Sequence, residues 1–342
     1  MSTFTLLLVE DEDSQIDDYK KVVADYNGDH ERGVHMLVKK TLNDAKICLN
    51  KSIDAAIIDL NLGRGTADGA EVINEVKEHF RIPVAILTGT PSEADDEPPV
   101  VQVFTKGQHS FKDVLDYLWT VYETGLTKIM GGRGELEKRL SNVFLKNLVP
   151  AMEMWIRYGK QDKERTECAL LRHALGYLVA DLEADGERPF YPEEVYLAPP
   201  LNNSLQTGSL VRLKKEGSVH LVITPACDLV IRKNGKPKTD VVVVAEIVPM
   251  ATVYRELEPN SNKKKNLKNN NFALYYHWLP NLDDFEAGFV DFRRLKTVMW
   301  DKFNRSFEHL EIRVAPSFIK DIISRFSAFY ARQGQPTINS EN

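Results

Sequence analysis

The chain has 342 residues, of which 43% are hydrophobic and 27% charged, with a formal net charge of -6. This length suits about two domains with packed cores. The acidic balance excludes a protein built mainly to coat nucleic acid, although one domain could carry a local basic face. The sequence has three widely separated cysteines and no run of about 18 apolar residues, so neither a disulfide framework nor a membrane span is indicated. A reducing cytoplasm is the expected location.

The first third of the chain alternates short β-branched runs with amphipathic stretches. We expect strands at residues 5–9, 34–40, 55–60, 83–89 and 100–105, and helices at 14–26, 42–50, 70–80 and 109–123. This alternation predicts an α/β fold, a doubly wound parallel five-stranded sheet over residues 1–125. Residues 91–99 contain three prolines and a cluster of acids where a crossover helix belongs. That helix is therefore expected to be short, irregular or missing.

A helical linker is expected over residues 126–188. It begins in the glycine-rich segment 125–134, which we interpret as a hinge. Helical spacing then places four apolar residues on one side, a face expected to pack on the last helix of the sheet domain or on a second copy: Leu136, Leu140, Val143 and Phe144. Pro150 is expected to break or kink this run.

Residues 189–342 change to β-type runs separated by turns, which predicts a β-rich, barrel-like α+β domain. Residues 219–231 and 239–248 are among these runs. Residues 261–271 are rich in Lys and Asn and are expected to form a polar loop. The last amphipathic stretch, 315–334, predicts a helix that covers an open sheet edge.

Five residues lie where the predicted strands of the first domain end. Glu10 and Asp11 follow the first strand, Asp59 ends the third, Thr88 the fourth and Lys106 the fifth. The carboxyl ends of parallel strands share one edge of the sheet, so these side chains are expected to converge. Clustered carboxylates repel one another unless a hard cation neutralises them, and Mg²⁺ prefers oxygen ligands. The sequence thus predicts a Mg²⁺ site in which Asp59 is the nucleophile toward a phosphoryl group.

Four motifs at these strand ends resemble the receiver domains of bacterial two-component response regulators. They are LLLVEDE (6–12), IIDLNLGRGTADGAEVI (57–73), ILTGT (86–90) and VFTKG (103–107). The resemblance covers about the first 125 residues and implies a flavodoxin-like receiver domain. It also implies a sensor histidine kinase or a phosphotransfer protein as partner.

The resemblance also implies a role for each motif residue. Asp59 would be the phosphoacceptor, and Thr88 and Lys106 the phosphoryl-binding switch pair. Mg²⁺ would be held by Glu10, Asp11, Asp59 and the backbone carbonyl of Asn61. Many receivers carry an aromatic residue three positions before the lysine, whereas this chain has Val103 there and Phe104 next to it. The usual route from phosphorylation to output is therefore expected to differ here.

The leading hypothesis is a response regulator, not itself an enzyme, whose C-terminal region or linker helices bind a protein partner or self-associate. No helix-turn-helix is evident, and the most basic stretch, KKKNLK (263–268), falls in the predicted polar loop. Nucleic-acid binding thus stays an alternative that no motif in the sequence indicates.

Two rival functions stay open. One is a receiver-gated hydrolase or nuclease, in which Cys227 and Asp228 with His220 or His277 could form a nucleophilic site. TGSLVRL and HLVITP also faintly resemble the small SH3-like barrels of endoribonuclease toxins. The other rival is a phosphoryl sink that drains a kinase without any output. By analogy alone, the chain is also similar to receiver proteins of bacterial anti-phage systems.

Overall fold

The computed structural model describes residues 4–30, 33–49, 52–60, 62, 73–74, 76, 81–89, 101–184, 189–202, 204–233, 235–283 and 285–332. The chain divides into two compact units, residues 1–186 and 187–342. Segments 63–72 and 91–99, where a phosphoacceptor loop and a degraded crossover helix were expected, lie outside the described residues. Among the described residues no helix is long and apolar enough to cross a membrane.

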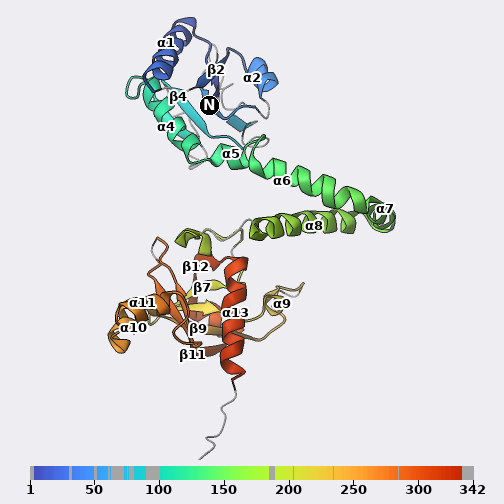
Figure 1. Cartoon of the computed structure of the whole chain (residues 1–342), viewed down its shortest axis with the longest axis vertical. Helices are drawn as coiled ribbons and strands as arrows, with labels where there is room; N and C mark the ends of the chain where they lie inside the picture. Colours follow the sequence, from blue (N-terminus) through green and yellow to red (C-terminus); the bar gives the residue numbers. More distant parts are fainter. Residues whose placement is uncertain are drawn as a thin grey trace, which may run out of the picture. The chain divides into compact units, whose positions relative to one another are not determined.

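The first unit contains a five-stranded sheet followed by helices (Figure 1). In chain order its elements are β1 (Phe4–Val9), α1 (Asp13–His30), β2 (Val34–Lys39), α2 (Leu42–Cys48), β3 (Ala55–Ile58), β4 (Val84–Thr88), β5 (Val101–Thr105), α4 (Phe111–Glu123), α5 (Leu126–Met130), α6 (Glu135–Val143), the π-helical η2 (Phe144–Leu148), the 3₁₀-helical η3 (Val149–Ala151), α7 (Met152–Gln161) and α8 (Lys163–Ala184).

The five strands pair in parallel in the order β2-β1-β3-β4-β5. Alternate residues of the central strands point to opposite faces, and both faces are buried, which explains their nearly continuous apolar sequences. Leu6 and Leu8 pack with α1 and α4 on one face, whereas Leu7 and Val9 pack with α2 on the other. This is the predicted flavodoxin-like, doubly wound sheet, and its strand order creates a crevice at the carboxyl ends of β1 and β3.

The glycine-rich segment after α4 packs against the residues that precede β3 and β4, so its glycines have a packing role that the hinge interpretation did not foresee. The Arg81 Nε donates a hydrogen bond to the Met130 carbonyl at 2.6 Å. A guanidinium nitrogen of Arg133 donates one to the Ser52 carbonyl at 2.7 Å. A Cβ on Gly131 would lie 2.4 Å from the Thr127 carbonyl oxygen. Glycines are therefore required here for close packing rather than for freedom of movement.

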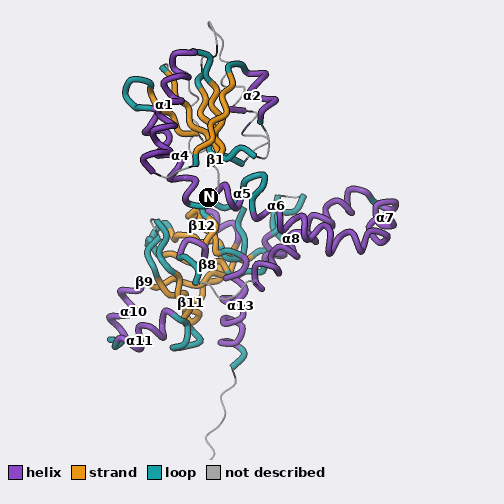
Figure 2. Tube along the Cα trace, turned by 45° about the horizontal axis from the view of Figure 1, so that its top comes forward, coloured by secondary structure: helices purple, strands orange, loops and turns teal. Residues whose placement is uncertain are grey.

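A helical hairpin completes the first unit. The helix that starts at α6 passes through η2 and η3, where Pro150 removes an N–H donor, and continues into α7. The chain reverses at Asp162 rather than at Pro150, and the Asp162 carboxylate accepts a hydrogen bond from the Arg165 amide. α8 then runs back along α7 and α6 (Figure 2). The helix that packs on α6 is thus α8 of the same chain rather than the last helix of the sheet domain, and packing on a second copy stays a prediction.

The second unit is an antiparallel seven-stranded sheet with helices on both faces. Its elements are the 3₁₀-helical η4 (Pro192–Val195), β6 (Tyr196–Leu197), β7 (Ser209–Leu213), β8 (Val219–Val222), α9 (Ala226–Leu229), β9 (Val241–Pro249), α10 (Met250–Leu257), α11 (Ser261–Lys268), β10 (Tyr276–Leu279), β11 (Gly288–Met299), α12 (Trp300–Ser306), β12 (Phe307–Val314) and α13 (Pro316–Tyr330).

This sheet has the order β10-β11-β9-β8-β7-β12-β6. The two edges of the sheet curl toward each other, since the Tyr196 hydroxyl of the edge strand β6 donates a hydrogen bond at 2.6 Å to the Pro280 carbonyl, next to the opposite edge strand β10. Register shifts in β11 and β12 add to the curl.

Three local expectations for this unit were wrong. α13 packs through Phe318, Ile322 and Phe326 on a face of the sheet rather than on an edge. Residues 226–229 form a helical turn inside the predicted strand 219–231. α11 replaces most of the polar loop expected at 261–271.

Candidate functional site

Three of the predicted site residues meet at the carboxyl edge of the parallel sheet. The Lys106 Nζ lies 2.8 Å from the Glu10 Oε2 and 2.8 Å from the Asp59 Oδ2. Glu10 follows β1, Asp59 follows β3 and Lys106 follows β5, so the strand order brings together residues 47 and 96 positions apart. An ammonium between two carboxylates neutralises part of their mutual repulsion.

Backbone hydrogen bonds hold these strand ends in place. The Glu10 amide donates to the Lys39 carbonyl, the Asp59 amide to the Val9 carbonyl and the Lys106 amide to the Thr88 carbonyl. The Glu12 amide also donates to the Glu10 Oε1 at 3.1 Å, which fixes that carboxylate. The backbone at each of these strand ends is therefore positioned by a neighbouring strand.

Burial shapes the electrostatics of the edge. Glu10 is 2% exposed, and this burial raises the pKa of its carboxyl, although the hydrogen bond from Lys106 partly offsets the effect. Burial lowers the pKa of Lys106, but its hydrogen bonds to Asp59 and Glu10 outweigh that effect, so the pKa is raised overall. Lys106 is thus held as a cation, because two buried carboxylates need its charge.

The other predicted site residues are placed differently. Thr88, at the end of β4, is fully buried. Asp11 is exposed beside the buried Glu10. Asn61 falls outside the described residues. Val103 is half-buried in the α2-side core, whereas Phe104 is buried on the opposite face against Tyr117 and His109.

The predicted ligands carry oxygen atoms of the kind that a hard cation prefers. Glu10, Asp11 and Asp59 offer carboxylate oxygens, and one Lys106 ammonium cannot neutralise three carboxylates. Among the described residues, however, no three His, Cys, Asp or Glu side chains are grouped as metal ligands. Glu10 and Asp59 meet at Lys106, whereas Asp11 is exposed. The Mg²⁺ site stays a prediction.

Tyr19 of α1 is a neighbour of this edge that sequence reasoning missed. Burial raises its pKa to about 12, with smaller effects from Lys106 and Glu10. Its ring stacks on Phe111 of α4 at 4.1 Å between centroids. The helical periodicity places Tyr19 on the inner side of α1, but no motif marks it as a neighbour of the acids.

The proposed nucleophilic group of the second unit is not assembled. Cys227 is exposed, and its Sγ lies 3.8 Å from the Asp228 Oδ1. Asp228 in turn pairs with Lys238 at 3.1 Å. His220 and His277 are buried in the sheet, and no hydrogen bond joins either of them to Cys227 in the described part of the chain.

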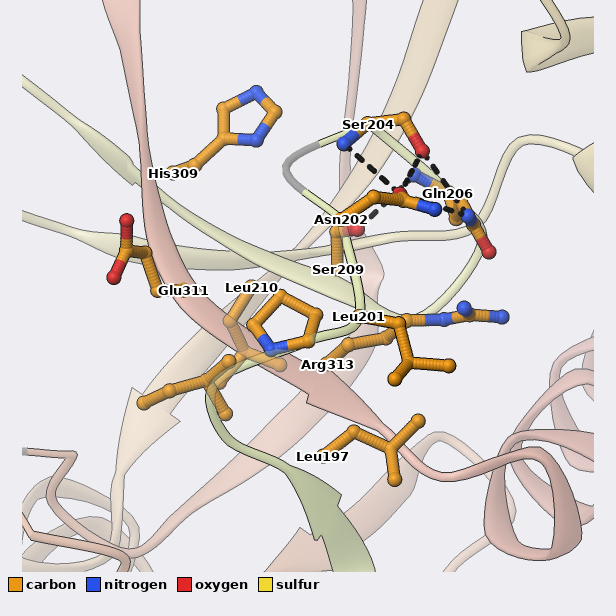
Figure 3. A pocket seen from close by; sticks show the side chains of 12 residues that line it. Leu197, Leu201, Asn202, Ser204, Gln206, Ser209, Leu210, His309, Glu311 and Arg313 are labelled. Atoms are coloured by element: carbon orange, nitrogen blue, oxygen red, sulfur yellow. Dashed lines mark hydrogen bonds between the residues drawn. The ribbon is translucent and has the colours of Figure 1, made fainter. Parts of the chain in front are cut away.

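A pocket of about 150 Å³ lies beside β12 in the second unit (Figure 3). Glu311 there adopts φ 53°, within the register shift between His309 and Arg313. In a regular strand these three side chains would share one face. In the close-up, Glu311 and the Arg313 guanidinium instead point to opposite sides, while the Asn202 carboxamide binds Ser204 and Gln206. The register shift thus separates Glu311 from the Arg313 guanidinium in this pocket.

Comparisons with known proteins find structural similarity for the N-terminal part of the chain. No protein-family model and no curated protein sequence matches the chain. Among solved structures, a CheY-like receiver domain from Methylobacillus flagellatus is 16% identical, with a TM-score of 0.29, over 35% of this chain and 99% of that one.

Two further similar structures have similar coverage. A receiver domain protein from Bacillus halodurans is 20% identical, with a TM-score of 0.27, over 34% of this chain and 97% of its own. The PhyR receiver domain from Erythrobacter litoralis is 17% identical, with a TM-score of 0.27, over 35% and 89%. The strand order β2-β1-β3-β4-β5 shows that the first third of this chain has the flavodoxin-like fold, which is the fold of response-regulator receiver domains.

Proposed function

We propose that the chain is a response regulator that accepts a phosphoryl group on Asp59 from a sensor histidine kinase or phosphotransfer protein. The observation that carries this proposal is the bridge from Lys106 to Glu10 and Asp59, with both N–O distances at 2.8 Å. A lysine that holds the nucleophilic carboxylate is already placed to neutralise a phosphoryl oxygen next to it.

The transfer step follows from this geometry. An Asp59 carboxylate oxygen attacks phosphorus, a P–O bond to Asp59 forms, and the P–N bond to the donor histidine breaks, leaving that imidazole to take up a proton. Lys106 then exchanges its bond to the carboxylate for one to a phosphoryl oxygen. Glu10, Asp11 and Asp59 would hold Mg²⁺, which supplies charge neutralisation for the phosphoryl oxygens when bound.

The readout proposed for this step is a change in what the linker and C-terminal region bind. Phe104, rather than the half-buried Val103, is the aromatic of β5, and it packs against α4. A phosphoryl group that draws Lys106 and the end of β5 toward Asp59 would therefore act on α4, the helix that leads into α5 and α6.

The test is phosphorylation by acetyl phosphate with Mg²⁺, read by intact-protein mass spectrometry. We expect one added phosphoryl group on the wild type and none on Asp59→Asn, which keeps the size but removes the nucleophile. Asp18→Asn, at an exposed carboxylate of α1, is the matched control and should be labelled like the wild type. Chelation of Mg²⁺ should suppress labelling. Equal labelling of Asp59→Asn and wild type would overturn the proposal, as would a wild type that is never labelled.

A further inference from the structure

The outer side of α8 carries a stripe of exposed apolar side chains, here called the α8 stripe. Its members are Leu171 (64% exposed), Leu175 (50%), Val179 (52%) and Leu182 (61%). They are spaced by four, four and three residues, which places all of them on one side of an α-helix. Large apolar side chains exposed together in this way mark an interaction surface.

The α8 stripe is separate from the surface that forms the hairpin. α8 meets the neighbouring helices through the buried Thr166, through His173, whose ring lies 5.5 Å from that of Trp155, and through Asp181, which pairs with Arg139 at 2.6 Å. At 100° per residue these positions lie on the other side of the helix from the stripe, and the buried Leu178 lies at the border between the two surfaces. The hairpin is thus complete without the α8 stripe.

We propose that the α8 stripe binds a second copy of this chain, with the two α8 helices antiparallel. In that pairing Leu171 lies level with the second copy's Leu182, and Leu175 with its Val179. A two-fold axis repeats both layers, so the stripe matches itself in four apolar layers. The proposal concerns α8 alone and does not depend on phosphorylation of Asp59.

Charge selects the antiparallel direction. Arg172 and Glu183 each follow a stripe residue and lie on the same flank of it, and neither forms an ion pair with another described residue. In the antiparallel pair each Arg172 faces the second copy's Glu183. In a parallel pair the same flank of the two copies lies on opposite sides of the interface, so neither Arg172 nor Glu183 would meet its opposite charge.

The size of the stripe sets the expected strength of the dimer. Eleven residues separate Leu171 from Leu182, which is about 16 Å of helix at 1.5 Å per residue. An interface of this length is small, so we expect a dissociation constant in the micromolar range, roughly 1 to 100 µM.

Sedimentation equilibrium of the full chain tests the surface. We expect a monomer–dimer equilibrium for the wild type and a dissociation constant at least ~30-fold higher for Leu175→Glu, because the charge would be buried between the helices. Ile156→Glu, at a similarly exposed apolar position of α7, is the matched control and should dimerise like the wild type. Leu182→Glu, near the helix end, repeats the test at a site where folding is least affected.

Exchange of the flanking charges tests the direction. Arg172→Glu alone and Glu183→Arg alone should each raise the dissociation constant about 3- to 10-fold, whereas a mixture of the two variants should restore the wild-type value through two attractive pairs. A wild type that is monomeric at about 200 µM would overturn the proposal, as would a Leu175→Glu variant of unchanged mass. If Ile156→Glu dissociates the dimer, the interface lies on α7 instead of the α8 stripe. If mixing the two charge variants does not restore the dissociation constant, the antiparallel pair is excluded.

Discussion

At the scale of single residues, the acidic edge depends on one cation. Glu10 and Asp59 are both buried, and each accepts a hydrogen bond from Lys106. A buried carboxylate is costly unless it is paired, so the ammonium stabilises the fold as well as preparing the site.

Lys106→Ala should therefore lower the free energy of unfolding of the receiver unit by about 2 to 4 kcal/mol, because Glu10 loses its counter-charge. Urea denaturation at pH 7 measures the change. Lys20→Ala, whose pair with Asp17 is exposed, is the control and should shift stability by no more than about 0.5 kcal/mol. Equal effects of the two variants would mean that the buried triad does not support the fold.

Sequence reasoning could place these residues because each follows an apolar strand, and parallel strands share an edge. Glu10, Asp59 and Lys106 meet as expected. The alternation of adjacent side chains at a strand end could have predicted that Asp11 is exposed where Glu10 is buried, but the motif led us to treat both as ligands. Tyr19 was missed, since its approach depends on how α1 packs and no local pattern encodes that.

At the scale of elements, the turn between α4 and α6 is held by close packing. A Cβ on Gly131 would lie 2.4 Å from the Thr127 carbonyl oxygen, and one on Gly134 would lie 2.5 Å from the Ile129 carbonyl oxygen. The Thr127 hydroxyl donates to the Asp54 carbonyl, so a shift of α5 would disturb the base of β3.

Gly131→Ala should accordingly destabilise the first unit by about 1 to 3 kcal/mol, because backbone atoms must move to admit the methyl group. Thermal unfolding and the hydrogen-exchange protection of α5 measure this effect. In contrast, Gly159→Ala in α7 meets no atom within 4 Å and should be neutral or stabilising by up to about 1 kcal/mol. A turn that tolerated both substitutions alike would be a hinge after all.

Helix α11 was not predicted from the sequence, because its formation depends on tertiary contacts as well as on composition. Residues 261–268 read as a polar loop, yet Asn260 caps the helix by accepting a hydrogen bond from the Lys263 amide. Leu267 is buried, and Lys264 and Lys268 lie over the rings of Tyr254 and Trp278. Lysine is a good helix former, so the composition allowed either structure, and packing decided.

At the scale of the whole molecule, the two units have separate cores and different chemistry at their centres. The first buries a charged edge, whereas the second buries histidines within its sheet. His277 of β10 is 7% exposed, and burial, with a contribution from Arg325, lowers its pKa to about 3. Asp321 lies 3.6 Å from the ring but is largely exposed, so its charge is screened and burial dominates.

The C-terminal unit should therefore lose stability in mild acid. His277 stays neutral in the folded unit down to about pH 3, whereas in the unfolded chain it takes up a proton below about pH 6.5. The unfolded state thus binds more protons between these values, and stability falls as the pH falls. From pH 7 to pH 5, His277 alone should remove about 2 kcal/mol, and His220, whose pKa burial also lowers, should add to the loss.

Urea unfolding of the full chain at pH 7 and pH 5 measures this loss. Trp278 and Trp300 report on the C-terminal unit once Trp119 and Trp155 are replaced by Phe. His277→Gln cannot take up the proton, so it should abolish about 2 kcal/mol of the acid loss even if it lowers stability at pH 7. His35→Gln, at an exposed position of β2, should leave the pH dependence unchanged. An acid loss as large in His277→Gln as in the wild type would show that His277 is already protonated in the folded unit, against its burial beneath α13.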